Sequence, residues 1–168
     1  MKRLSLLRHA KSSWKDTKLD DHDRPLNARG RAAAEAIGRV LSEPGLRPDI
    51  VLCSTAARAR ETLDHLFELP PPTRVQAGLY LAPPERILEY IHGLDDKLGS
   101  ALVIGHNPGL ATLACALAIG AETRGPARFS GKFPTAALAV FDLDISRWSD
   151  VAPGCAVAAA LTRPRDLK

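Results

Sequence analysis

Residues 2–14 read KRLSLLRHAKSSW, and the rest of the chain is organised around this stretch. Its short leucine-rich run predicts a first β-strand that ends at Arg8 and His9. Successive side chains of a strand point to opposite faces, so these two can converge on one ligand only where the strand has become a loop. Residues 10–13 are typical of that loop. A guanidinium beside an imidazole in such a turn suits a site that holds a phosphoryl group and attacks it. The alternative is a strand end with a surface arginine and a structural histidine.

The composition is that of one globular domain. The chain has 168 residues, 45% of them hydrophobic and 25% charged, which is enough to form one sizeable core. We therefore expect a single domain over residues 1–168. The first apolar run stops at Arg8 and is too short for a signal-peptide core, and no later window has the length of a transmembrane helix. These features predict a cytoplasmic protein with no membrane partner.

The charge and the cysteines bear on the class of ligand. The net charge of +4 favours an anionic ligand in a general way. Lys and Arg are scattered rather than striped, and only two Trp, two Tyr and four Phe are available for base stacking, which argues against nucleic acid. The three cysteines lie far apart in apolar runs, and no clustered Cys/His spacing indicates a metal. We expect neither a metal nor a cofactor.

Strands and helices alternate through most of the chain. Strand patterns occur at residues 49–53, 101–104, 136–141 and 156–161, with a weaker one at 74–77, and helix patterns at 27–41, 56–67, 84–93 and 108–117. Residues 120–133 are expected to be loop and residues 163–168 a solvated tail. The alternation predicts an α/β fold of three layers, in which helices flank a mostly parallel central sheet.

Three of the predicted strands end in residues that a phosphoryl site needs. The first ends in Arg8 and His9, the second is followed by Arg58 at the start of a helix, and another leads into His106 and Asn107. In open α/β sheets ligands bind at the carboxyl ends of the strands, so these side chains can meet in one crevice.

Several motifs occur in order between Arg8 and His106. They are Arg8-His9-Ala10 with Ser12 and Trp14, Asp23-Arg24-Pro25-Leu26 with Gly30, Ser54-x3-Arg58-Ala59-x2-Thr62, and Gly105-His106. Together they resemble the histidine phosphatase superfamily, also called phosphoglycerate-mutase-like. The short chain and the Arg-His-Ala-Lys-Ser wording are most similar to the SixA-type phosphohistidine phosphatases. The resemblance spans about residues 4–110, matches the final strands more weakly, and implies a phosphoglycerate-mutase-like fold.

The resemblance implies roles for the matching residues. His9 would be the nucleophile of a metal-independent phosphohydrolase, forming a phosphohistidine intermediate that water hydrolyses. An imidazole attacks only through an unprotonated nitrogen, so a backbone carbonyl should hold the other one. Arg8, Arg58 and His106 would bind the phosphoryl oxygens and stabilise the developing charge. Ser12 is a further substrate-binding candidate.

The role that we infer for Asn107 is not part of the family's pattern. It is expected to help bind the phosphoryl group together with the amino end of the helix that follows it. Larger family members use a carboxylate as general acid, either in a mid-chain segment or directly after the second catalytic histidine. An asparagine in the second place cannot serve.

Glu85 is therefore the possible proton donor, because it lies in the mid-chain segment. Its alternative role is a favourable charge at a helix N-terminus. The first loop offers further candidates, namely Asp16, Asp20, Asp21 and Asp23. A missing acid would favour a phosphoramidate or phosphoanhydride, whose leaving group departs more easily than an alkoxide.

These observations define three hypotheses on function. The first is a histidine phosphatase acting on phosphohistidine-containing protein or another activated phosphate. The second is a non-catalytic module that binds a phospho-ligand in the same cationic pocket, and the third is a small-molecule phosphomonoesterase of the same superfamily. The partner is accordingly a phosphorylated protein or a small phosphorylated substrate. Outside the pocket, Ser54 is expected to cap the second helix. Arg124, Arg128 and Lys132 are expected to form either a rim for an acidic or phosphorylated partner or a solvated loop.

Overall fold

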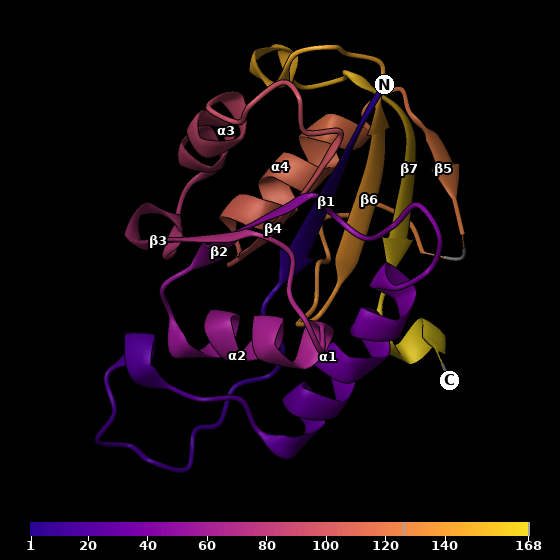
Figure 1. Cartoon of the computed structure of the whole chain (residues 1–168). Coiled ribbons are helices and arrows are strands. Elements are labelled where there is room, and N and C mark those ends of the chain that lie inside the picture. Colours follow the sequence, from indigo (N-terminus) through magenta and orange to yellow (C-terminus); the bar gives the residue numbers. More distant parts are fainter. Residues whose placement is uncertain (126, 168) are drawn as a thin grey trace.

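The computed structural model describes residues 1–125 and 127–167, which form a seven-stranded sheet with helices on both faces (Figure 1). The strands are β1 (Lys2–Arg8), β2 (Ile50–Ser54), β3 (Thr73–Gln76), β4 (Ser100–Gly105), β5 (Glu122–Arg124), β6 (Leu138–Leu143) and β7 (Ala156–Thr162). The α-helices are α1 (Ala28–Leu41), α2 (Ala57–Leu66), α3 (Pro84–His92) and α4 (Gly109–Ala118). Single turns of 3-10 helix are η1 (Asp21–Asp23), η2 (Ala77–Leu79), η3 (Trp148–Asp150) and η4 (Pro164–Leu167).

The sheet has the order β3-β2-β4-β1-β6-β7-β5, which places β1 at its centre. Its pairs β1–β4, β2–β4, β2–β3 and β5–β7 are parallel, whereas β6 runs antiparallel to both β1 and β7. The predicted fold class is confirmed, because parallel pairs predominate and helices cover the sheet.

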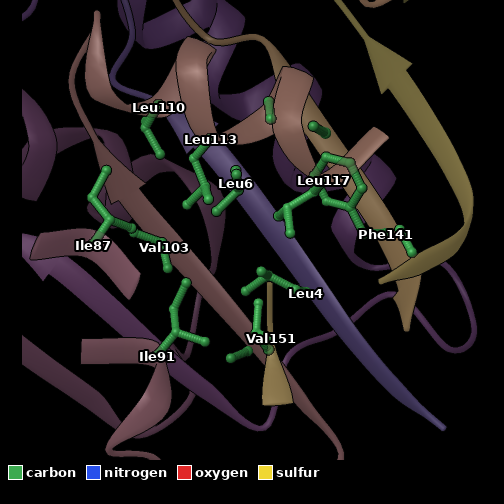
Figure 2. Close-up of a cluster of buried hydrophobic side chains, with 14 of the residues drawn as sticks. Leu4, Leu6, Ile87, Ile91, Val103, Leu110, Leu113, Leu117, Phe141 and Val151 are labelled. Atoms are coloured by element: carbon green, nitrogen blue, oxygen red, sulfur yellow. The ribbon is translucent and has the colours of Figure 1, made fainter. Parts of the chain in front are cut away.

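The leucines of β1 are buried on both faces of the sheet. Leu4 and Leu6 belong to a cluster with α3 and α4, which Figure 2 shows around Leu113. Leu7 points into a second cluster that includes side chains of α1 and α2. A central strand covered on both sides can place apolar side chains at successive positions, which explains why Leu6 is followed directly by Leu7; the small Ser5 is buried between Leu4 and Leu6.

Two segments differ from the expectation. Residues 122–124, expected as loop, form the edge strand β5, which pairs with β7. Its residues, Glu-Thr-Arg, show no apolar pattern, because an edge strand of three residues buries little side-chain surface. The expected tail forms η4 instead, where Arg163 makes a two-point ion pair with Asp166. Pro126 and Lys168, at which the expected loop and tail also lay, are outside the described residues.

The strands that matter for the site end side by side. Arg8 pairs with Gly105 in the β1–β4 ladder, and Cys53 of β2 pairs with Ile104 of β4. The His9 backbone N–H continues the ladder by donating to the Gly105 carbonyl at 3.0 Å. The residues that follow these strands are therefore brought to one edge of the sheet. In the part of the chain that the structure describes, no helix is long and apolar enough to cross a membrane.

Candidate active site

A pocket of about 270 Å³ lies at the carboxyl ends of β1, β2 and β4. Six residues predicted from the sequence line it together: Arg8, His9, Ser12, Arg58, His106 and Asn107. Glu85 does not line it. That residue is exposed in the first turn of α3, where its charge suits the helix N-terminus. The residues from three separate strand ends thus meet, and the mid-chain acid does not join them.

His9 is buried, and its hydrogen bonds define one tautomer. Its Nδ1 lies 2.7 Å from the carbonyl oxygen of Ala10, which can only accept, so Nδ1 carries the proton. Its Nε2 lies 3.2 Å from Nε of Arg58, which can only donate, so Nε2 is the unprotonated nitrogen. Burial lowers the pKa of His9 to about 4, and nearby arginines reinforce that shift. The ring is therefore neutral near pH 7, with its free electron pair on Nε2.

The loop after β1 is tied to α2 through Thr62. The hydroxyl of this fully buried side chain accepts from the Ala10 backbone N–H at 2.9 Å and donates to the Arg58 carbonyl at 2.6 Å. Residues four apart on a helix lie on one face, so the spacing from 58 to 62 places the arginine and this hydroxyl together. The same contact holds the peptide that orients His9.

Arg58 lies in the first turn of α2 and is almost fully buried. Besides His9, it donates from Nη1 to the Asp21 carbonyl at 2.7 Å and from Nη2 to the Asp21 carboxylate at 3.0 Å. Its Nη2 also lies 3.4 Å from Nδ1 of His106. The guanidinium therefore connects both histidines and one carboxylate.

His106 is oriented by Ser54, a role that the sequence did not reveal. Nε2 of the ring lies 2.7 Å from the Ser54 hydroxyl, which is fully buried at the end of β2. Ser54 is not the N-cap residue of α2, which is Ala56, but its hydroxyl also accepts from the Ala56 backbone N–H at 3.2 Å. Burial lowers the pKa of His106 to about 3, with His9 and Arg58 adding to the effect. The one feature of the sequence that could have indicated this contact is the position of the Ser54 hydroxyl at the carboxyl end of a parallel strand.

Arg8 and Asn107 share one backbone acceptor. Arg8 donates from Nη1 to the Phe133 carbonyl at 3.3 Å, and Asn107 donates from Nδ2 to the same oxygen at 2.7 Å. The buried Nε of Arg8 and Oδ1 of Asn107 have no hydrogen-bond partner among the residues described. One hydrogen-bond donor and one acceptor beside the pocket are thus free to bind a ligand.

Asp21 enters the site from the first loop. Its carboxylate accepts hydrogen bonds from the Tyr80 hydroxyl, from Arg24 Nη2 at 3.0 Å and from Arg58. These donors, led by Tyr80, hold the pKa of Asp21 well below its usual range. This candidate acid is therefore ionised near pH 7 and positions cations rather than donating a proton.

Tyr80 and Arg24 complete the wall around these groups. The Tyr80 and His106 rings pack edge to face, with their centroids 5.4 Å apart. Arg24 donates to the Ser12 hydroxyl at 2.7 Å and stacks on the Trp14 ring. Arg24 belonged to a recognised motif, but no pattern in the sequence connected Tyr80 with the strand ends.

The pocket places an unprotonated histidine nitrogen beside two arginines, which suits the binding and transfer of a phosphoryl group. Residues 4–80 match the model of the histidine phosphatase superfamily (branch 1). The protein Rv1276c of Mycobacterium tuberculosis, described as uncharacterized, is 41% identical over 161 residues, which is 95% of this chain and all of that protein. The chain belongs to the histidine phosphatase superfamily and is a phosphohydrolase. This assignment favours an enzyme over the non-catalytic binding module.

Solved structures place the chain beside SixA proteins. A candidate phosphohistidine phosphatase SixA from Agrobacterium tumefaciens is 33% identical, with a TM-score of 0.72 over 84% of this chain and 91% of that one. Another candidate phosphohistidine phosphatase SixA, from Nakamurella multipartitia, is 29% identical, with a TM-score of 0.76 over 96% of this chain and 93% of that one. The phosphoglycerate-mutase-like fold is therefore SixA-like in detail.

Proposed function

We propose that the protein hydrolyses an activated phosphate, phosphohistidine above all, through a phosphohistidine intermediate at His9. The observation that carries the proposal is the fixed tautomer of this ring. The Ala10 carbonyl holds Nδ1, and Nε2 is the unprotonated nitrogen, whose electron pair accepts a hydrogen bond from Arg58 Nε until a substrate takes that place. Nε2 attacks phosphorus as the bond from phosphorus to the leaving group breaks, and water then attacks the phosphohistidine and returns His9 to its neutral form.

The binding of the phosphoryl group falls to the cations around Nε2. Arg58 and Arg8 clamp the equatorial oxygens of the phosphoryl group, and Ser12 lines the same pocket. Asn107 and the amino end of α4 contribute further hydrogen-bond donors. Phosphoryl transfer gains mainly from positioning and from stabilised charge, so a preorganised set of this kind supplies most of the catalysis. Arg58 is buried and held by carbonyl and carboxylate acceptors, and the half-buried Arg8 is held by a carbonyl, so both cations are largely in place before the substrate arrives.

His106 can serve as a donor because Ser54 can reverse its hydrogen bond. A hydroxyl both donates and accepts, so it can give its proton to Nε2 of the ring as well as receive one from it. When Ser54 donates, Nδ1 of His106 carries the proton; its contact with the Arg58 Nη2 donor is then given up, and Nδ1 can donate to a phosphoryl oxygen instead. The distance of 2.7 Å between the hydroxyl and Nε2 suits either direction.

The choice of phosphohistidine rests on the missing acid. No aspartate or glutamate occurs among the described residues that line the pocket, and Asp21 beside it is ionised. An alkyl phosphate expels a poor alkoxide and gains much from a general acid, whereas a phosphoramidate leaves more readily. The SixA neighbours, named as candidate phosphohistidine phosphatases, agree with this choice.

We also propose one domain over residues 1–168, working in the cytoplasm. The single sheet combines β1 from the start of the chain with β7 from near its end, which supports one folding unit. Cys53, Cys115 and Cys155 are free thiols, as is usual in a reducing compartment.

Labelling tests the covalent step. The full chain, mixed with labelled phosphoramidate and quenched at short times, is expected to carry an acid-labile, alkali-stable label. The label should vanish in His9→Ala and persist in His65→Ala, a control on α2 whose side chain pairs with Glu35 away from the pocket. The absence of both label and turnover in the wild type would overturn the proposal. A rate on sugar monophosphates far above that on a phosphohistidine peptide would overturn the substrate class and favour the phosphomonoesterase.

A further inference from the structure

A second, larger hollow opens directly from the pocket. This groove has a volume of about 1160 Å³ and shares four lining residues with the pocket, namely Arg8, Lys11, Asn107 and Thr135. A ligand with its phosphoryl group at His9 can therefore extend into the groove without a break.

The groove is too long for a small phosphate ester. One wall is α1 from Arg29 to Ala36, the other is the segment 127–135, and the far end reaches η4. Seven steps along a helix cover about two turns, or about 10 Å. Small-molecule sites usually occupy roughly 300–1,000 Å³, and here the groove adds to a pocket that already holds the phosphoryl group. Its size fits a polypeptide segment.

The charges on the groove have one sign. Arg29, Arg128, Lys132 and Arg165 line it, and none of them has an ion-pair partner within the described part of the chain. The described lining residues include no carboxylate. Arg163, in contrast, is neutralised by Asp166. An anionic ligand would therefore meet uncompensated positive charge along the whole length.

The groove also has apolar lining. Ala32, Ala33 and Ala36 contribute small side chains from α1, Leu167 contributes from η4, and the largely buried Phe133 contributes from segment 127–135. A chain of phosphates would gain nothing from these methyl groups. A peptide segment with acidic residues on one side and apolar residues on the other would bury its apolar side against them, as amphipathic helices do in other grooves.

We propose that this groove docks an acidic, amphipathic segment of the phosphorylated partner protein, next to the phosphorylated side chain. The inference rests on the proposed function, which it deepens by naming the class of substrate. Docking adds binding energy away from the reacting atoms, so it lowers KM for protein substrates and leaves the chemical step unchanged.

Charge reversal in the groove tests the proposal. The probes are two phosphohistidine peptides, one with an acidic amphipathic flank and one with Gln in place of each Glu, and phosphoramidate as the small substrate. In Arg29→Glu/Arg165→Glu, KM for the acidic peptide is expected to rise at least about tenfold, while kcat and the rate on phosphoramidate stay the same. The control is Arg39→Glu, an exposed residue of the same helix outside the groove, which should change neither.

The outcomes separate this proposal from the one on which it rests. Equal KM values for the two peptides in the wild type, or an equal loss with the neutral peptide in the double variant, would refute docking. Groove-dependent inhibition by tripolyphosphate, with no preference for the acidic peptide, would assign the groove to a small polyanion and would also refute it. If phosphoramidate is not hydrolysed at all, the proposed function itself fails.

Discussion

Thr62 offers a sharp test of how the nucleophile is positioned. Its hydroxyl accepts from the Ala10 N–H and donates to the Arg58 carbonyl, while the Ala10 carbonyl holds Nδ1 of His9. Thr62→Val keeps the shape and the branching of the side chain but removes the hydroxyl. The change therefore breaks the tie between the nucleophile loop and α2 without opening a cavity.

The magnitude follows from the burial of the groups involved. Ala10 and Thr62 are fully buried, so the Ala10 N–H would lose its partner in a place that water does not reach. An unsatisfied buried donor costs about 1–3 kcal/mol. The Arg58 carbonyl is a lesser loss, because it can keep a bond within the helix. We expect the free energy of unfolding to fall by about 2 kcal/mol and kcat to fall by about 10- to 100-fold, since small displacements at a reacting group are costly.

Urea unfolding at pH 7 and steady-state hydrolysis of phosphoramidate measure the two effects. An unchanged m-value would show that the loss of stability arises in the folded state. Thr62→Ser is the matched control, because it keeps the hydroxyl and removes only a methyl group. It should lose about 1 kcal/mol and retain most of its kcat. If Thr62→Val and Thr62→Ser are equally active, the contact with Ala10 does not position His9 and the reasoning is refuted.

Three further changes probe the charge and packing of the site. The free energy of unfolding is expected to fall as the pH drops from about 6.5 toward 3, because His9 and His106 are neutral in the folded state and take up protons in the unfolded state. For His9 the loss is on the order of 3 kcal/mol. In His9→Gln, urea unfolding at a series of pH values should show a smaller fall of this free energy with pH. Asp21→Asn should lower kcat by about tenfold through the loosened arginine and lower the pKa of Tyr80 in an ultraviolet titration, whereas unchanged values of both would contradict the positioning role. Gly30→Ala would place a Cβ against the Lys11 carbonyl, so calorimetry should show a loss of roughly 2 kcal/mol, and full stability would rule out that close approach.

The strand ends were predictable because they follow from local pattern and one topological rule. An apolar run followed by Arg8 and His9 indicates where β1 stops, and the same holds for the strand before His106. Parallel strands bring their carboxyl ends to one edge, so the convergence of these residues needed no knowledge of the loops. The tautomer of His9 was also expected, from the need for a free nitrogen, and the structure supplies the carbonyl in Ala10.

The contacts of Ser54, Asp21 and Tyr80 depend on paths that no periodicity describes. The Ser54 hydroxyl accepts locally from the Ala56 N–H at the start of α2 and also bonds to the distant His106. The second contact exists only because β2 pairs with β4. Asp21 reaches Arg58 through a polar loop whose course is set by Arg24 and Tyr80. Sequence identifies such side chains as candidates, but their partners arise from tertiary packing.

Whether a carboxyl group can act as general acid depends on its contacts in the folded chain. Sequence position favoured Glu85, which the structure leaves exposed on α3 away from the pocket. The carboxylate that does reach the site, Asp21, accepts from two arginines and a tyrosine, and each of these bonds favours its ionised form. A group held in this way strengthens the cationic clamp but has no proton to give. A pocket with firm clamps, and with no aspartate or glutamate among its described lining residues, is suited to leaving groups that depart without strong assistance. The contact that orders Arg58 therefore agrees with the phosphoramidate substrate that we propose.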